Sequence, residues 1–142
     1  MKKTFFILLS TLLISTASIA SENMAKGLNV IVTSKDAQTQ MMAMVLSMMT
    51  IQDNKKVNMV LCSDAGDLAV KGMESPLLKP KDKSPKMMLM ALIKKGADVK
   101  VCPLYLPNAS KDASVLLDGI TVAKPAEVAQ NLLNKDYQNL SY

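Results

Sequence analysis

Two thiols are the side chains of this 142-residue chain that are best suited to chemistry. Cys62 and Cys102 each follow an apolar segment that predicts a β-strand, and Pro103 ends the second strand because proline lacks a backbone N–H. An accessible thiolate can take up a sulfur atom as a persulfide and hand it to another thiol, without histidine or metal. We therefore predict Cys102 as a reactive thiol that water can reach. Cys62 fits either a supporting role or a small apolar side chain in the core.

Two neighbours could support chemistry at Cys102. Lys100 lies two positions earlier in the chain, so both side chains fall on the same face of a strand. A nearby ammonium group favours the thiolate form of a cysteine. Tyr105 stands in the loop that follows the strand. We include Lys100 and Tyr105 as supporting residues of a site centred on Cys102.

Two carboxylates follow the other cysteine. Asp64 and Asp67 come shortly after Cys62 and could form an acid pair. They also fit the cap and the first turn of a short helix, where carboxylates accept bonds from free backbone N–H groups. Asp64 is therefore a supporting candidate under the first interpretation and a structural residue under the second.

The residue types that are missing exclude several kinds of site. The chain has no histidine, so a Ser-His or Cys-His catalytic pair cannot form and the commonest zinc ligand is absent. Every basic residue is a lysine, which removes the bidentate arginine contacts that recognise phosphate and guanine. With no tryptophan, a surface that stacks nucleic-acid bases is not expected. We predict no nucleic-acid partner and no cofactor.

The N-terminal segment has the pattern of an export signal. Lys2 and Lys3 precede an apolar stretch that starts at Phe5, and small residues end at Ala20. We predict a signal peptide over 1–20, removed to leave one domain over 21–142 in the periplasm or outside the cell, with no further membrane association. The alternative is a membrane anchor, although the stretch is shorter than the ~20 residues that span a bilayer.

Apolar patterns of two periods alternate along the rest of the chain. Near-continuous apolar runs predict strands at 27–34, 55–62, 97–102 and 120–123. Helical spacing and caps predict helices at 36–53, 63–72, 85–96, 108–119 and 124–134, with a loop at 73–84. This order predicts an α/β fold, a single three-layer domain with a mostly parallel sheet of four or five strands and helices on both faces. Both cysteines then fall at the carboxyl ends of strands, where ligand sites collect. The tail at 135–142 is expected to be a frayed end.

A disulfide is the default pairing for two cysteines of an exported protein. In many doubly wound sheets the first strand lies between the second and the third, which would put Cys62 and Cys102 about 9.6 Å apart. A disulfide requires Cα atoms within about 7 Å. We therefore expect two free thiols, and leave open a bridge that loop movement would allow.

Methionine is unusually frequent, with twelve residues in the chain. In the first predicted helix, Met44 and Met48 lie on one face and Met42 and Met49 on another. A helix with two apolar faces has to pack on both sides, against the sheet and against a second subunit, so we expect a homo-oligomer. The alternative is a Cu(I) site, for which thioethers and thiolates are suitable soft ligands; Met44, Met48 and Cys102 would be its first ligands. Packing is the simpler interpretation, because methionine fills gaps in cores.

Three segments resemble the DsrE-like sulfur-relay family, whose members share the YchN-like fold. The run "MLMALIKKGADVKVCPLYLP" (88–107) is similar to the family's helix, glycine and strand that deliver a cysteine. The runs "VNMVLCSDAGDLAVKG" (57–72) and "GLNVIVTS" (27–34) resemble its second and first strands with their surroundings. The resemblance implies a trimer or hexamer of small α/β subunits, with Cys102 at the position of the sulfur-accepting cysteine. Well-described relay members are cytoplasmic, whereas this chain has an export pattern.

These observations predict an exported, DsrE-like protein that binds or relays sulfane sulfur as a persulfide on Cys102. It would act as a sulfurtransferase or as a sulfur carrier, with a donor or acceptor protein as its partner. Two alternatives stay open. One is a non-catalytic oligomeric interaction module, and the other is the Cu(I)-binding protein with methionine and cysteine ligands.

Overall fold

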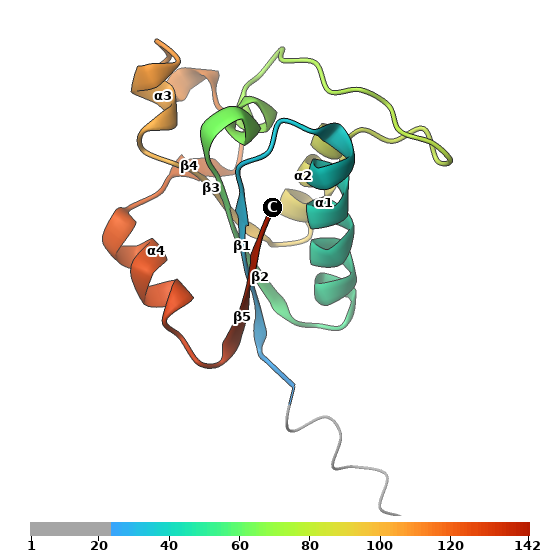
Figure 1. The fold of residues 1–142 in the computed structure, drawn as a ribbon, viewed down its shortest axis with the longest axis vertical. Helices are drawn as coiled ribbons and strands as arrows, with labels where there is room; N and C mark the ends of the chain where they lie inside the picture. Colours follow the sequence, from blue (N-terminus) through green and yellow to red (C-terminus); the bar gives the residue numbers. More distant parts are fainter. Residues whose placement is uncertain (1–23) are drawn as a thin grey trace, which may run out of the picture.

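The computed structural model describes residues 24–142, which form an α/β domain (Figure 1). The predicted signal peptide and its cleavage site lie outside the described residues. In chain order the elements are β1 (Gly27–Val32), α1 (Ala37–Gln52), β2 (Lys56–Leu61), the 3-10 helix η1 (Ser63–Ala69), α2 (Pro85–Lys94), β3 (Asp98–Val101), α3 (Tyr105–Asn108), the 3-10 helix η2 (Ala113–Val115), β4 (Ile120–Val122), α4 (Pro125–Leu132) and β5 (Tyr137–Ser141). All five strands are parallel, which confirms the predicted fold class.

Local capping explains where the two long helices begin. The Asp36 side chain accepts a bond from the Thr39 N–H at 2.8 Å and caps α1. Ser84 caps α2 in the same way, and Pro85 occupies the first helical position, where no backbone N–H is needed. Gly96 follows α2 with a φ of 92°, a left-handed conformation that favours glycine and turns the chain into β3. The sequence patterns therefore predicted both helices at the places where the structure has them.

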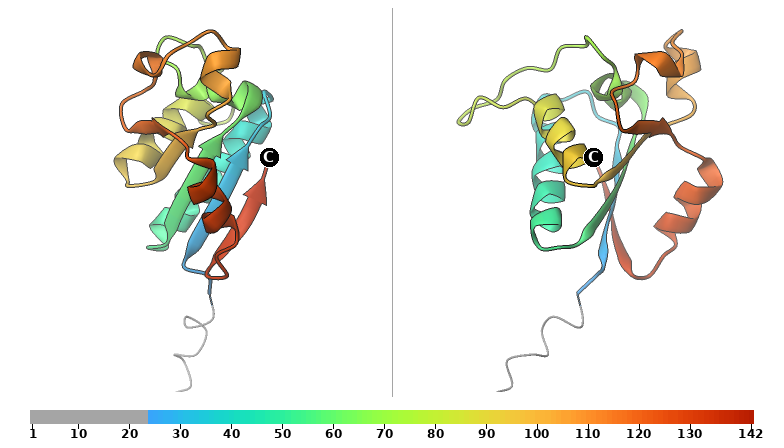
Figure 2. Two further views of the ribbon diagram at one scale, coloured as in Figure 1. Left: turned by 90° about the vertical axis from the view of Figure 1, so that its left-hand side faces the viewer. Right: turned by 180° about the vertical axis from the view of Figure 1, so that it is seen from behind.

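The strand order is β4-β3-β2-β1-β5, which corrects one expectation. We expected β1 between β2 and β3, but β2 lies between β1 and β3. From β1 to β4 the chain moves across the sheet in one direction, so right-handed crossovers put α1 and α2 on the same face. The return from β4 to β5 runs the other way, and α4 therefore covers the opposite face (Figures 1 and 2). The domain has three layers, as predicted.

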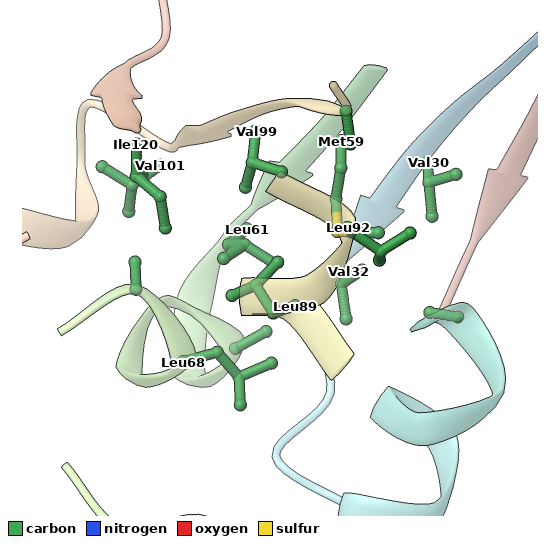
Figure 3. Packing of buried hydrophobic residues seen from close by; sticks show 14 of the residues in the cluster. Val30, Val32, Met59, Leu61, Leu68, Leu89, Leu92, Val99, Val101 and Ile120 are labelled. Atoms are coloured by element: carbon green, nitrogen blue, oxygen red, sulfur yellow. The ribbon is translucent and has the colours of Figure 1, made fainter. Parts of the chain in front are cut away.

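The main core fills the space between the sheet and the two helices α1 and α2. Side chains alternate along each strand, so every second residue of β1, β2 and β3 points into this core. Figure 3 shows several of these side chains packed against Leu89 and Leu92 of α2. The strand residues of this core are Val30, Val32, Val57, Met59, Leu61, Val99 and Val101, all of them buried. The alternate positions consequently face α4, and both cysteines belong to that second set.

The C-terminal tail is a strand, which corrects the prediction of a frayed end. β5 pairs in parallel with β1, and this pairing places Asn139 beside Asn29. The Asn29 amide donates to the Asn139 side chain at 2.9 Å and to the Asn131 carbonyl at 2.6 Å, while Asn58 donates to Asn29 at 2.9 Å. These asparagines form a polar ladder across three strands and hold the end of α4 against the sheet. The tail is ordered by its pairing with β1 and by this ladder.

The helix predicted at 63–72 is the shorter 3-10 helix η1, which ends at Ala69. The helix expected at 108–119 is instead the four-residue α3, which starts earlier, followed by the 3-10 turn η2. The predicted loop at 73–84 is observed and extends away from the body of the domain (Figures 1 and 2). Within residues 24–142, every helix is too short or too polar to cross a membrane.

Candidate thiol site

Cys62 and Cys102 occupy equivalent places at the ends of neighbouring strands. The last register pair of β2 and β3 is Leu61 with Val101, so the two cysteines form the next pair. The Cys102 N–H donates to the Leu61 carbonyl at 2.8 Å, and the Cys62 N–H donates to the Val32 carbonyl at 2.8 Å. The backbone of both residues is therefore held by the ladder of the sheet, although neither belongs to a strand. The spacing that we expected, with a strand between them, is wrong because β2 and β3 are adjacent.

The two thiols lie side by side. Both are free and half-buried, and they line the same two hollows at the edge of the sheet. Burial, together with the neighbouring Cys102, raises the pKa of the Cys62 thiol to about 11. Cys62 consequently keeps its proton at neutral pH and can donate it to a neighbouring sulfur.

Two open hollows meet at the cysteine pair. One is lined by Cys62, Ser63, Asp64, Cys102, Leu104, Tyr105, Asn108 and Ala109. The other lies between the sheet and α4 and is lined by the two cysteines with Ile31, Val60, Pro103, Leu104, Ala123, Pro125, Val128, Ala129 and Leu132. Polar side chains are confined to the first hollow, and every residue of the second is apolar apart from its thiols. The cysteines can therefore be approached from a polar side and from an apolar side.

The chain leaves the sheet sharply after Cys62. Ser63 has a φ of 50°, a left-handed conformation that is uncommon for residues other than glycine. The turn starts η1 and brings Asp64 to the rim of the polar hollow, with its side chain exposed. Asp64 is thus the carboxylate of this candidate site, whereas Asp67 serves another contact.

Tyr105 is a buried wall of the site. Its hydroxyl donates a hydrogen bond to an Asp67 carboxylate oxygen, and burial together with this bond raises the pKa of the Tyr105 hydroxyl. The ring lies directly over Gly66, where a Cβ atom would stand 2.3 Å from Tyr105 Cδ2. Gly66 is not among the site residues predicted from the sequence, and Asp67 was predicted only as a cap or as half of an acid pair. A glycine inside a predicted helix, away from its ends, is the signal that could have identified the close approach.

Lys100 shares a sheet face with Cys102, as the spacing predicts, but its ammonium group is directed elsewhere. Lys100 Nζ is bonded to the Asp98 carboxylate, two residues back on β3. The two side chains lie beside Asn58 and Glu127 in a polar depression under α4. Neither hollow at the cysteines is lined by Lys100. The Lys100 ammonium group therefore makes no contact that would support chemistry at Cys102, as we had expected it to do.

The three ligands considered for Cu(I) are not brought together. Met44 and Met48 are buried on α1 in the main core, on one side of the sheet. Cys102 lines the hollow under α4, on the other side. A shared metal would have to sit inside the sheet between them. The structure therefore separates this ligand set, and the methionines act as core residues.

The fold is similar to two solved structures. The crystal structure of the YchN protein from E. coli matches 82% of this chain and 99% of its own, with a TM-score of 0.66 and 21% sequence identity. The protein of unknown function MTH1491 from Methanobacterium thermoautotrophicum matches 82% of this chain and 98% of its own, with a TM-score of 0.61 and 11% identity. No protein-family model and no curated protein matches the chain. The likeness establishes a YchN/DsrE-like fold and confirms the predicted resemblance at that level.

Proposed function

We propose that this chain, with its YchN/DsrE-like fold, takes up sulfane sulfur as a persulfide on Cys102 and passes it to an acceptor thiol. One observation carries the proposal: Cys102 stands at the carboxyl edge of the sheet, lines two open hollows and lies beside a second thiol that holds its proton. A sulfur donor can reach such a cysteine. The neighbouring Cys62 thiol can stabilise negative charge on the Cys102 sulfur by donating an S–H hydrogen bond. The protein would serve as a sulfur carrier or as a sulfurtransferase.

The transfer is a pair of thiol exchange steps. The Cys102 thiolate attacks the outer sulfur of a donor persulfide, R–S–SH; the new bond joins the two sulfurs and R–S⁻ leaves. An acceptor thiolate then attacks the outer sulfur of the Cys102 persulfide and releases the Cys102 thiolate. Atoms and electrons balance in each step, and neither step requires a metal or a cofactor. The polar hollow beside Asp64 gives donor and acceptor an approach to Cys102.

Two single-thiol variants test this proposal. Cys62→Ser retains only Cys102, and Cys102→Ser retains only Cys62, so the two variants are matched controls for one another. Each is incubated with glutathione persulfide without oxygen, and its intact mass is measured. We expect Cys62→Ser to gain one sulfur atom and Cys102→Ser to gain none. Uptake by Cys102→Ser alone, or by neither variant, would contradict the proposal, and uptake by neither would favour a non-catalytic interaction module.

We also propose that the protein acts after export, as the domain Ser21–Tyr142. The support is the sequence pattern at 1–20, a basic start followed by an apolar stretch and small residues. Fractionation of cells, with the intact mass of the recovered protein, tests this proposal. A chain that starts at Ser21 in the periplasm or medium is expected, and a full-length chain in the cytoplasm would contradict it.

A homo-oligomer is the third part of the proposal. Met42, Leu46 and Met49 form an exposed stripe on α1, and Met87 and Met90 are exposed on α2, which packs beside α1. Large apolar side chains gathered on adjacent helices are typical of a surface that another protein covers. A second copy of the chain is the occupant that we propose, because α1 carries methionines on both its buried and its exposed sides.

A further inference from the structure

We propose that Cys62 is a resolving thiol: when Cys102 carries a persulfide, Cys62 attacks the Sγ atom of Cys102, closes a Cys62–Cys102 disulfide and releases the outer sulfur as sulfide. This inference rests on the proposed function, because it requires a persulfide on Cys102. It adds an activity, the reduction of sulfane sulfur to sulfide whenever no acceptor arrives. The protein would therefore both carry sulfane sulfur and discharge it.

The backbone geometry permits the disulfide. The cysteines follow the Leu61–Val101 register pair, so they are neighbours on adjacent parallel strands. Such neighbours have Cα atoms about 4.8 Å apart, inside the range of about 4.4–6.8 Å in which disulfides form. Their side chains lie on the same sheet face, since both line the hollow under α4. Bridging the two sulfurs therefore requires no exchange of strands and no opening of the sheet.

The positions of the two thiols also suit the reaction. The Cys62 thiol stands beside the Cys102 sulfur, which is the atom that it has to attack, because the two residues follow a register pair and line the same two hollows. A persulfide adds its second sulfur beyond Cys102, toward the two open hollows. The departing sulfur therefore has a route to solvent. A thiol buried elsewhere in the core would have neither this neighbour nor the exit.

The proton inventory fits the step. With an anionic persulfide the reaction is Cys62–SH + Cys102–S–S⁻ → Cys62–S–S–Cys102 + HS⁻. The two cysteine sulfurs are oxidised, the outer sulfur is reduced, and the proton of Cys62 leaves with the sulfide. Burial raises the pKa of Cys62, so its proton has to pass to the outer sulfur of the persulfide before the Cys62 thiolate attacks. A dithiol reductant then returns two hydrogens to the cysteines by thiol–disulfide exchange and becomes a disulfide itself.

A single-turnover experiment tests the inference. Reduced wild-type protein, Cys62→Ser and Cys102→Ser are each mixed with glutathione persulfide without oxygen, and intact mass and released sulfide are followed together. We expect the wild type to lose two hydrogens and to release sulfide equimolar with protein, above the level of a protein-free blank. Cys62→Ser should keep one added sulfur and release none above the blank. Dithiothreitol should restore the reduced mass of the wild type.

The outcomes separate the two proposals. If the wild type holds its added sulfur as long as Cys62→Ser does, Cys62 is not a resolving thiol, and the persulfide proposal stands. If Cys62→Ser gains glutathione instead of sulfur, the donor reacts through its inner sulfur, and both proposals fail. A circular dichroism spectrum equal to that of the wild type shows that each variant is folded, and Cys62→Ala provides a second resolving-thiol variant for the same comparison.

Discussion

Cys62 and Cys102 stand side by side at the carboxyl ends of β2 and β3, one step beyond the register pair Leu61–Val101. Forty positions separate them in the chain, yet their thiols line the same two hollows. The sheet ladder fixes both backbones, through bonds of 2.8 Å to Leu61 and Val32. The chemistry of either residue is therefore a property of the pair, and each prediction about one sulfur involves the other.

The oxidised protein should be more stable than the reduced protein. A Cys62–Cys102 bridge closes a loop of about 40 residues, which by chain entropy stabilises the folded state by about 4 kcal/mol. Urea unfolding of protein oxidised with diamide, with and without dithiothreitol, measures the difference. The Cys62→Ser variant is the control, because it cannot form the bridge and should unfold at one urea concentration under both conditions. Equal stability of the oxidised and reduced wild type would show that the bridge strains the sheet.

The reduced protein should lose stability in alkaline solution through Cys62. Its pKa is raised in the folded state to about 11, above the ordinary value near 9. Keeping the proton favours folding, so this contribution is complete below pH 9 and is lost as the pH rises from 9 to 11. The free energy of unfolding, measured by urea with dithiothreitol present, should fall more steeply over this range for the wild type than for Cys62→Ser. Parallel profiles would mean that Cys62 titrates in the folded chain as it does in the unfolded chain.

Gly66→Ala should disturb the wall of the polar hollow. The added Cβ would stand 2.3 Å from Tyr105 Cδ2, so the ring has to move and its bond to Asp67 is displaced. Overpacking of this kind costs about 1–3 kcal/mol of stability. A double-mutant cycle with Tyr105→Ala supplies the control, because removal of the ring makes room for the methyl group. Additive losses in the cycle would show that ring and glycine do not depend on each other.

Asn29→Ala should loosen the C-terminal strand. Asn29 is 3% exposed and bonds to Asn139, Asn58 and the Asn131 carbonyl. Loss of its amide leaves these groups short of a partner, at a cost of about 1–3 kcal/mol. Amide hydrogen exchange should accelerate in β5 more than in β2. Gln138→Ala, an exposed change on β5 itself, is expected to leave the exchange as it is in the wild type. Uniform acceleration across the sheet would contradict a local role for the ladder.

Charges on the exposed methionine stripe should dissociate the proposed oligomer. Met42 and Met49 are 51% and 46% exposed on α1, so lysine at both positions can be solvated in a free monomer but not in an apolar interface. Size-exclusion chromatography with light scattering should show a smaller particle for the double variant than for the wild type. Leu133→Lys, directly after the end of α4, is the control, because this side chain is 82% exposed on another part of the surface. A wild type that already runs as a monomer would overturn the proposal of self-association.

Local patterns were enough to predict most elements of this protein. Apolar runs marked β1 to β4, and residues such as Asp36 and Pro85 marked helix starts, because these features depend on residues close together in the chain. The same patterns put both cysteines at the carboxyl edge of the sheet. The face shared by Lys100 and Cys102 also followed from the two-residue period of a strand.

The amino-acid sequence was therefore sufficient for the alternation of strands and helices and for the sheet edge at which the thiols lie. The folded chain was needed to learn that β2 and β3 are neighbours, that the tail pairs with β1, and that Lys100 bonds to Asp98. Strand order depends on how helices pack across the whole sheet, and side-chain partners depend on distances between remote segments. Neither is recorded in the periodicity of a single segment, which is why the adjacency of Cys62 and Cys102 required the folded chain.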